Sequence, residues 1–269
     1  MTTLLPPDFA DWLRLREPAD AAARSAELVD AVRRRLPAHR PVIVHDLGSG
    51  TGSMVRWLAP RLPGPQHWVL HERDADLRAH AAVDLIAAAD GRPVTVRTCG
   101  SDITRLRAAD LADAHLVTAS ALLDMLTAEE IERMAAACTG RPTLFAITVL
   151  GRVEFTPADP LDAEFAAAFN AHQRRTVDGR TLLGPDAVAA TVAAFRRRGV
   201  DAQVRASPWR LGPDQAALTA EWLVGWLDAA VAERPELAGA AGSYRDRRLA
   251  EAATGRLRVV LHHADLLAG

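Results

Sequence analysis

The 269-residue chain contains no lysine, because all 32 of its basic residues are arginine. Without an ε-amino group it has no Schiff-base nucleophile, no phosphate-loop lysine and no lysine general base. Cysteine is scarce as well: Cys99 and Cys138 are the only two, and neither has a partner at the spacing of a zinc site. We therefore expect no metal site and no disulfide framework, and both cysteines should be buried small apolar residues.

Long apolar runs and a strong net charge are also missing. No apolar run approaches the ~20 residues of a membrane-spanning helix, and residues 1–10 lack the basic and apolar regions of a signal peptide. The 34 acidic residues leave a net charge of −2, which disfavours a nucleic-acid partner because such binding needs a basic field. We expect a cytoplasmic protein with no membrane partner, built as one domain with insertions.

The most informative segment is residues 42–53, VIVHDLGSGTGS. Its apolar start predicts a buried parallel strand, and Gly48, Gly50 and Gly52 form a tight turn before a helix. Glycines let the backbone approach a ligand closely, and the helix start offers unpaired N–H groups, so this is a nucleotide-type site. The spacing is G-x-G-x-G and position 53 is Ser, which makes a dinucleotide the weaker alternative.

Further strands and helices alternate with this segment along the chain. Strands are predicted at residues 67–70, 94–97 and 143–150, and later at 202–206 and 257–262. Thr127 begins T-A-E-E, a capping box that starts a helix running to about residue 137. The pattern predicts an α/β fold with a doubly wound, mostly parallel seven-stranded sheet and helical insertions.

The segment 42–53 resembles motif I of the class I S-adenosylmethionine-dependent methyltransferases, in which apolar residues, an acidic residue and G-x-G-x-G follow one another. Residues further along the chain resemble later segments of this family, in the same order. Glu72, about 20 residues after the turn, takes the place of the acid that binds the ribose hydroxyls. Residues 100–103 resemble the segment that contacts adenine, and residues 114–126 resemble the fourth strand and the loop after it. The resemblance implies a Rossmann-like fold and S-adenosylmethionine as the cofactor.

The resemblance also assigns residues to the cofactor. They are Asp46, Gly48, Ser49, Gly50, Gly52, Glu72, Arg73, Ser101, Asp102, Ile103, Thr118, Ala119, Ser120 and Arg16. In this assignment Asp102 accepts from the adenine amine, although an Asp that caps a turn is an equal alternative. Asp74 and Asp76 compete with Glu72 but fit a helix N-terminus better.

Helical additions flank the sheet. Residues 1–40 should form an N-terminal helical cap on the methyltransferase domain of residues 41–269, with Asp20 capping a helix over 21–36. Arg16 or Arg24 would pair with the carboxylate of the cofactor. A second insertion, 207–255, holds Trp222 and Trp226, which we interpret as core or homodimer contacts.

Residues 151–185 follow the fifth strand and are the expected substrate lid, because open α/β sheets bind ligands beyond the carboxyl ends of their strands. Phe165 and Phe169 would anchor its helix. His172 is the candidate general base, since imidazole titrates near neutrality; Asp124, after the fourth strand, is the next candidate.

These features predict methyl transfer from S-adenosylmethionine to a small-molecule substrate, with O- or N-methylation favoured because a protic acceptor suits a general base. Two alternatives stay open. One is a protein that binds S-adenosylmethionine without transferring its methyl group, and the other is an NAD(P)-dependent oxidoreductase.

Overall fold

The computed structural model describes residues 9–37, 40–81 and 86–269. Its centre is an eight-stranded sheet in the order β3-β2-β1-β4-β5-β10-β8, with the short β9 paired to β10. The first five strands run parallel, and β10 is antiparallel to β5 and β8. The strands are β1 (Val42–Leu47), β2 (Gln66–His71), β3 (Val94–Cys99), β4 (Leu116–Ser120), β5 (Thr143–Thr156), β8 (Ala202–Ala206), β9 (Trp209–Leu211) and β10 (Arg258–Ala268). The predicted doubly wound, mostly parallel sheet is confirmed.

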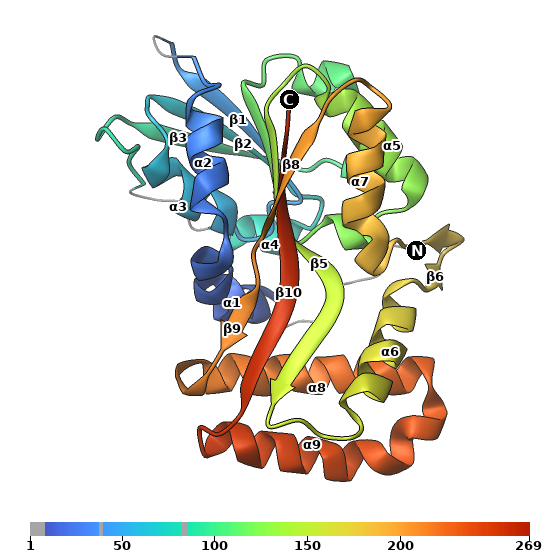
Figure 1. The fold of residues 1–269 in the computed structure, drawn as a ribbon. Helices are drawn as coiled ribbons and strands as arrows, with labels where there is room; N and C mark the ends of the chain where they lie inside the picture. Colours follow the sequence, from blue (N-terminus) through green and yellow to red (C-terminus); the bar gives the residue numbers. More distant parts are fainter. Residues whose placement is uncertain (1–8, 38–39, 82–85) are drawn as a thin grey trace.

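Helices cover both faces of the sheet (Figure 1). The described helices of the chain are α1 (Phe9–Ala23), α2 (Ala26–Arg33), α3 (Ser53–Leu58), α4 (Ala75–Ala79), α5 (Ala128–Cys138), α6 (Asp162–Gln173), α7 (Ala187–Arg196), α8 (Ala216–Glu233) and α9 (Ala238–Ala253). One core packs α2 and α3 on the sheet, and a second packs α5 and α7 on its other face. A two-stranded hairpin, β6 (Thr176–Val177) and β7 (Arg180–Thr181), follows α6.

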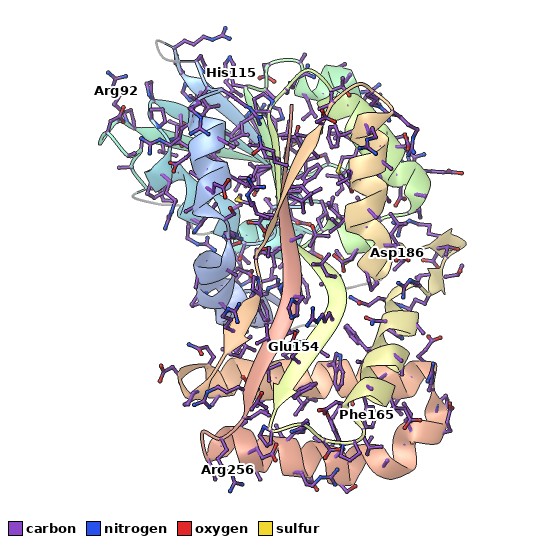
Figure 2. The ribbon with its side chains drawn as sticks, viewed as in Figure 1. Arg92, His115, Glu154, Phe165, Asp186 and Arg256 are labelled. Atoms are coloured by element: carbon purple, nitrogen blue, oxygen red, sulfur yellow. The ribbon has the colours of Figure 1, made fainter. Side chains whose placement is uncertain are left out.

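A third core lies beyond the carboxyl ends of the parallel strands, where α8 and α9 run side by side (Figure 1). Phe165, labelled in Figure 2, belongs to it: its ring centroid is 4.8 Å from that of Tyr244 and 6.1 Å from that of Trp226. Trp222 and Trp226 are buried in this core, with their ring centroids 5.5 Å apart. Of the two roles expected from the sequence, a core contact or a homodimer contact, this is the core contact. None of the described helices is long and apolar enough to cross a bilayer.

β5 and β10 carry the sheet into this third core and are longer than predicted. β5 continues from Leu150 to Thr156, and there Val153 pairs with Leu261 and Phe155 with Val259. The extension alternates exposed side chains with half-buried or buried ones, which is the strand pattern, but Gly151 interrupts its apolar residues. Gly151 has φ 68° and the ladder resumes after it, so the predicted lid of residues 151–185 starts inside a strand.

The N-terminal helices differ from the prediction. α1 passes through Pro18 to Ala23, and Ser25, whose side chain accepts from Leu28 N, caps α2. Asp20 is therefore no N-cap. It is buried, and its carboxylate accepts hydrogen bonds from the Arg16 guanidinium and from Trp209 Nε1. A buried carboxylate needs such donors, and this tertiary demand outweighs its local capping preference.

One smaller expectation is corrected as well. Cys138 is buried as predicted, whereas Cys99, at the end of the edge strand β3, is only half-buried. An edge strand has neighbours on one side alone, so its side chains are less covered.

Candidate functional site

The glycine turn joins β1 to α3 and needs its glycines for two reasons. Gly48, Gly50 and Gly52 have φ of 61°, 53° and 85°, a region that L side chains rarely adopt. A Cβ at Gly48 would also lie 2.9 Å from Leu122, and one at Gly50 would lie 3.1 Å from Leu13. The turn is thus bordered by the loop after β4 and by α1.

Glu72 braces this turn. One of its carboxylate oxygens accepts from Gly50 N at 3.0 Å, and the other accepts from Asp74 N at 3.0 Å. Each oxygen keeps a second lone pair, so the buried carboxylate can still accept from a diol. Asp74 caps α4 by accepting from Asp76 N and Leu77 N, as its alternative interpretation predicts.

Arg24 lies between α1 and α2, and its side chain is buried against the far end of the turn. Its Nη2 donates to Ser53 Oγ at 3.1 Å and to Ser120 Oγ at 3.0 Å. Its guanidinium carbon Cζ lies 5.3 Å from the Trp57 ring centroid. Burial lowers the pKa of Arg24, and Asp46 is among the carboxylates that oppose this effect.

Arg16, the arginine assigned from the sequence, has a different environment. Its Nε and Nη2 donate to Asp20 at 3.1 Å, and its guanidinium stacks 4.9 Å from the Trp209 ring centroid. Of the two arginines first considered, Arg24 is therefore the one that contacts the residues of the glycine turn and the end of β4.

Asp46, in β1 just before the turn, is 1 % exposed and accepts from Thr118 Oγ1 at 2.7 Å. Burial raises the pKa of Asp46 to about 7, against the Thr118 hydrogen bond and the charge of Arg24. Three buried polar atoms around the turn find no partner among the described residues: Asp46 Oδ2, Ser49 Oγ and Arg24 Nε. A ligand with both donors and acceptors would satisfy them.

Residues 100–103 follow β3 and lie beside Glu72 in the sheet order. Asp102 caps a short turn, because its Oδ1 accepts from Thr104 N at 3.0 Å and from Thr104 Oγ1 at 2.7 Å. Those hydrogen bonds, with the nearby charge of Arg73, lower the pKa of Asp102 although its partial burial acts in the opposite direction. Ser101 Oγ lies 2.7 Å from His71 Nδ1. Ile103 is half-buried.

The end of β4 brings the remaining assigned residues to the same place. Thr118 and Ala119 are buried, and Ser120 receives the Arg24 hydrogen bond. Asp124 follows in a short 3-10 helix, and burial raises its pKa although the charges of Arg16 and Arg175 oppose this. A carboxyl group with a raised pKa is suited to take up a proton.

His172 lies on α6, where its Nδ1 is 3.9 Å from a carboxylate oxygen of Glu233 on α8. Burial lowers the pKa of His172, Arg175 lowers it further, and Glu233 opposes both. Its role as a general base stays a prediction.

A small pocket lies between α6, α8 and the extended parts of β5 and β10. Aromatic rings line it on one side, from Phe169, Trp222 and Trp226. Two of its lining side chains carry polar atoms that are buried and unpartnered among the described residues, His263 Nδ1 and Gln173 Oε1. His263 lies just beyond the predicted strand of residues 257–262, and the continuation of β10 to Ala268 places it here.

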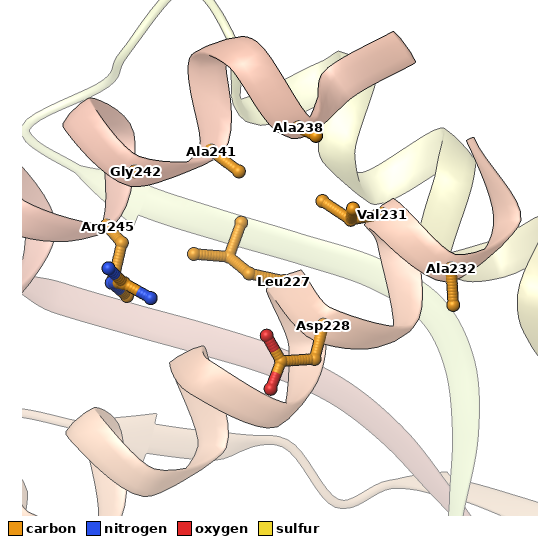
Figure 3. A pocket seen from close by; sticks show the side chains of 8 residues that line it. All are labelled: Leu227, Asp228, Val231, Ala232, Ala238, Ala241, Gly242 and Arg245. Carbon is orange, nitrogen blue, oxygen red and sulfur yellow. The ribbon is translucent and has the colours of Figure 1, made fainter. Parts of the chain in front are cut away.

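A wider hollow of about 520 Å³ lies between α8 and α9, with Asp228 and Arg245 at its rim (Figure 3). None of the buried unpartnered polar atoms lines it. The pocket beside His263 is therefore the better ligand candidate, because buried polar atoms without partners are costly unless a ligand completes them.

No protein-family model matches the chain, and no curated protein matches its sequence. Among solved structures, a cyclopropane synthase from Mycobacterium tuberculosis is similar with a TM-score of 0.50 and 15 % identity, over 100 % of both chains. A mycolic acid cyclopropane synthase complexed with SAH and CTAB gives a TM-score of 0.50 and 12 % identity, over 99 % of both chains. At such identities the likeness concerns the fold alone. The chain has the fold of the class I S-adenosylmethionine-dependent methyltransferases.

Proposed function

We propose that this chain transfers a methyl group from S-adenosylmethionine to a small-molecule acceptor. The observation that carries the proposal is the set of unpartnered buried atoms at the glycine turn: a guanidinium N–H of Arg24, a carboxylate oxygen of Asp46 and the hydroxyl of Ser49. An amino-acid group supplies a carboxylate and an ammonium, which match a cation and an anion held side by side.

The residues present fit the cofactor. Arg24 would pair with the carboxylate, Asp46 would accept from the ammonium, and the free lone pairs of Glu72 would accept from the ribose hydroxyls. Residues 100–103 would border the adenine. When bound, S-adenosylmethionine supplies an electrophilic methyl group on a sulfonium.

The acceptor would enter the pocket beside His263. This residue is two positions from Asp265, whose carboxylate accepts from Ser25 N at 2.7 Å, next to Arg24. The pocket therefore shares strand β10 with a residue that contacts the α1–α2 junction. Its aromatic lining favours an acceptor with an apolar body, and His263 Nδ1 offers one polar contact.

The chain's own residues would align the acceptor, exclude water and accept a proton. Alignment is the main requirement of an in-line displacement, and a dry site assists it. For a hydroxyl or amine acceptor, Asp124 has better support than His172 as the proton acceptor. Its pKa is raised by burial, and it follows Ser120, which contacts Arg24.

Calorimetry tests the cofactor assignment. We expect micromolar binding of S-adenosylhomocysteine and negligible binding of NAD, because the turn and Glu72 suit an adenosine without a pyrophosphate. Tighter binding of NAD would favour the oxidoreductase alternative. A screen of small apolar hydroxy and amino compounds, read out by formation of S-adenosylhomocysteine, then separates a transferase from a protein that only binds the cofactor.

A further inference from the structure

Asp265 lies on β10 opposite a β-bulge in β5. The register of the β5–β10 ladder shifts between Ala264 and Leu266, so residues 146 and 147 of β5 face the single residue Asp265. Ile147 has φ 55°, a conformation that is rare for a β-branched residue. Because a bulge leaves one residue outside the regular pairing, its backbone N–H needs an acceptor from elsewhere.

The Asp265 carboxylate accepts two backbone N–H groups from separate parts of the chain. Its Oδ1 accepts from Ile147 N at 2.8 Å, and its Oδ2 accepts from Ser25 N at 2.7 Å. Asp265 is 1 % exposed, and a buried carboxylate is costly unless its oxygens receive such hydrogen bonds. One side chain thus joins the bulge of β5 to the α1–α2 junction.

Ser25 is the residue after Arg24, and it is held from two directions. Its backbone N–H donates to Asp265, while its Oγ accepts from Leu28 N as the N-cap of α2. On the other side, Arg24 N donates to Asp20 O at 3.0 Å at the end of α1. The backbone from which the Arg24 side chain extends is therefore fixed both at Arg24 and at the next residue.

The direction of the Arg24 guanidinium depends on this fixed backbone. Its Nη2 reaches Ser53 Oγ and Ser120 Oγ, and its Nε has no partner among the described residues. If Ser25 lost its acceptor, the start of the Arg24 side chain would shift although no residue around the guanidinium had changed. Asp265 can thus influence the glycine turn without touching it.

We propose that Asp265 is a positioning residue, which fixes the backbone beside Arg24 and so directs its guanidinium to the carboxylate of the cofactor. The inference rests on the proposed function, in which Arg24 pairs with that carboxylate. Asp265 would act through Arg24 alone. It should therefore affect the binding of ligands that carry the amino-acid group and have little effect on the binding of the nucleoside.

The variant Asp265→Asn tests this role, because its side chain has the same size but accepts at only one end. The contact with Ile147 is fully buried, whereas the contact with Ser25 is only partly buried. An unpaired N–H costs more where water cannot reach it, so the remaining oxygen should stay with Ile147, and Ser25 should lose its acceptor.

Calorimetry with two ligands measures the effect of Asp265→Asn. We expect the affinity for S-adenosylhomocysteine to fall roughly tenfold, the lower end of the loss of a hydrogen bond to a charged group. Methylthioadenosine, which lacks the amino-acid group, should keep most of its affinity. An equal loss for the two ligands would overturn the proposal, because it would mean that Asp265 only maintains the fold.

A double-mutant cycle shows whether Asp265 acts through Arg24. In the Arg24→Met background, Asp265→Asn should cause no further loss of S-adenosylhomocysteine affinity, since the side chain that it misplaces is already gone. Independent, additive losses would contradict the proposed role.

Asp162→Asn is the matched control for general destabilisation. The Asp162 carboxylate accepts from Tyr244 Oη and from the buried Arg248 guanidinium, in the third core. We expect this variant to leave the ratio of the two ligand affinities unchanged. A ratio that changed as in Asp265→Asn would show that loss of stability alone explains the effect, and the proposal would fail.

Amide hydrogen exchange gives a readout that needs no ligand. We expect the Ser25 N–H to exchange faster in Asp265→Asn than in the wild-type protein, and the Ile147 N–H to exchange slowly in both. An unchanged rate at Ser25 contradicts the proposal. If the amides behave as expected and neither ligand binds the wild-type protein, the contact between Asp265 and Ser25 stands, while the proposed function fails and the positioning of Arg24 for a ligand fails with it.

Discussion

Arg24 Nη2 donates to Ser120 Oγ over 3.0 Å, and this contact joins the α1–α2 junction to the end of β4. The same nitrogen donates to Ser53 Oγ at the start of α3. One buried cation thus holds together three segments that border the glycine turn, while its Nε remains without a partner among the described residues.

Arg24→Met should separate recognition of the amino-acid group from recognition of the nucleoside. Loss of a charged hydrogen bond should weaken binding of S-adenosylhomocysteine by about 1.5–3 kcal/mol. Methylthioadenosine, which lacks the amino-acid group, should lose much less affinity. Arg16→Met is the control, because Arg16 is engaged with Asp20 and Trp209. Calorimetry with both ligands checks this; an equal loss for the two ligands would mean that Arg24 only maintains the local structure.

Glu72→Ala should weaken S-adenosylhomocysteine binding by ~1.5–3 kcal/mol, because the ribose would lose its acceptors and the turn would lose its brace at Gly50. Glu72→Gln keeps one acceptor oxygen and should lose less. Asp76→Ala, an exposed change on α4, serves as the control in the same titration. Unchanged affinity in Glu72→Ala would remove this residue from the cofactor site.

The two candidate bases can be separated by turnover of an acceptor found in the screen. Asp124→Asn should lower turnover by ~100-fold or more, the usual contribution of a positioned acid–base group, with little change in cofactor affinity. It should also remove the acidic limb of the pH–rate profile, because a base must be deprotonated to act. If His172→Ala shows these effects instead, α6 must carry the base.

Stability should depend on pH through His71. Burial lowers its folded pKa to about 4 from 6.5, so its contribution to the free energy of unfolding is complete above pH 6.5 and is lost as the pH falls towards 4. The stability difference between wild type and His71→Gln, measured by urea unfolding, should therefore shrink between pH 7 and pH 4.5. A difference that stays constant over this range would show that His71 titrates alike in both states.

The pH dependence of stability through Asp46 should be opposite to that through His71. Burial raises its pKa from 3.8 to about 7, so its contribution is complete below pH 3.8 and is lost as the pH rises through 7. Asp46→Asn should accordingly gain stability relative to wild type at pH 8. If the difference in the free energy of unfolding between wild type and Asp46→Asn were the same at pH 5 and pH 8, the raised pKa of Asp46 would be contradicted.

The parallel half of the fold follows from local patterns. The strand before the glycine turn and the capping box at Thr127 and Glu130 are both where the sequence places them, because each depends on residues close together in the chain. The position of Glu72 beside the turn could be predicted from its distance along the sequence.

The boundaries of the N-terminal helices could not be found in this way. Asp20 is a good N-cap residue by type, but its carboxylate is bound by Arg16, one turn earlier on α1, and by Trp209 from another part of the fold. Trp209 is far along the sequence, and no local pattern links the two residues.

The contact between His45 and His71 could not be predicted from the sequence either. His45 and His71 are each a lone histidine at the end of an apolar run, and only the pairing of β1 with β2 puts them on one face. Asp113 belongs to the connection before β4. Its carboxylate therefore comes near His45 only through the tertiary fold.

The β5–β10 ladder has a mechanical consequence, because its pairing continues on both sides of two register shifts. It runs from the parallel sheet into the third core, so the two parts share backbone hydrogen bonds and have no linker between them. A rigid ribbon of this kind does not bend as a hinge, so any opening of the predicted lid must begin after Thr156. Its far end is also fastened, because Arg180 of the β6–β7 hairpin holds Glu130 of α5 through two hydrogen bonds. We therefore expect access to the pocket beside His263 to depend on shifts of α6, which lines it, while the third core moves with the sheet.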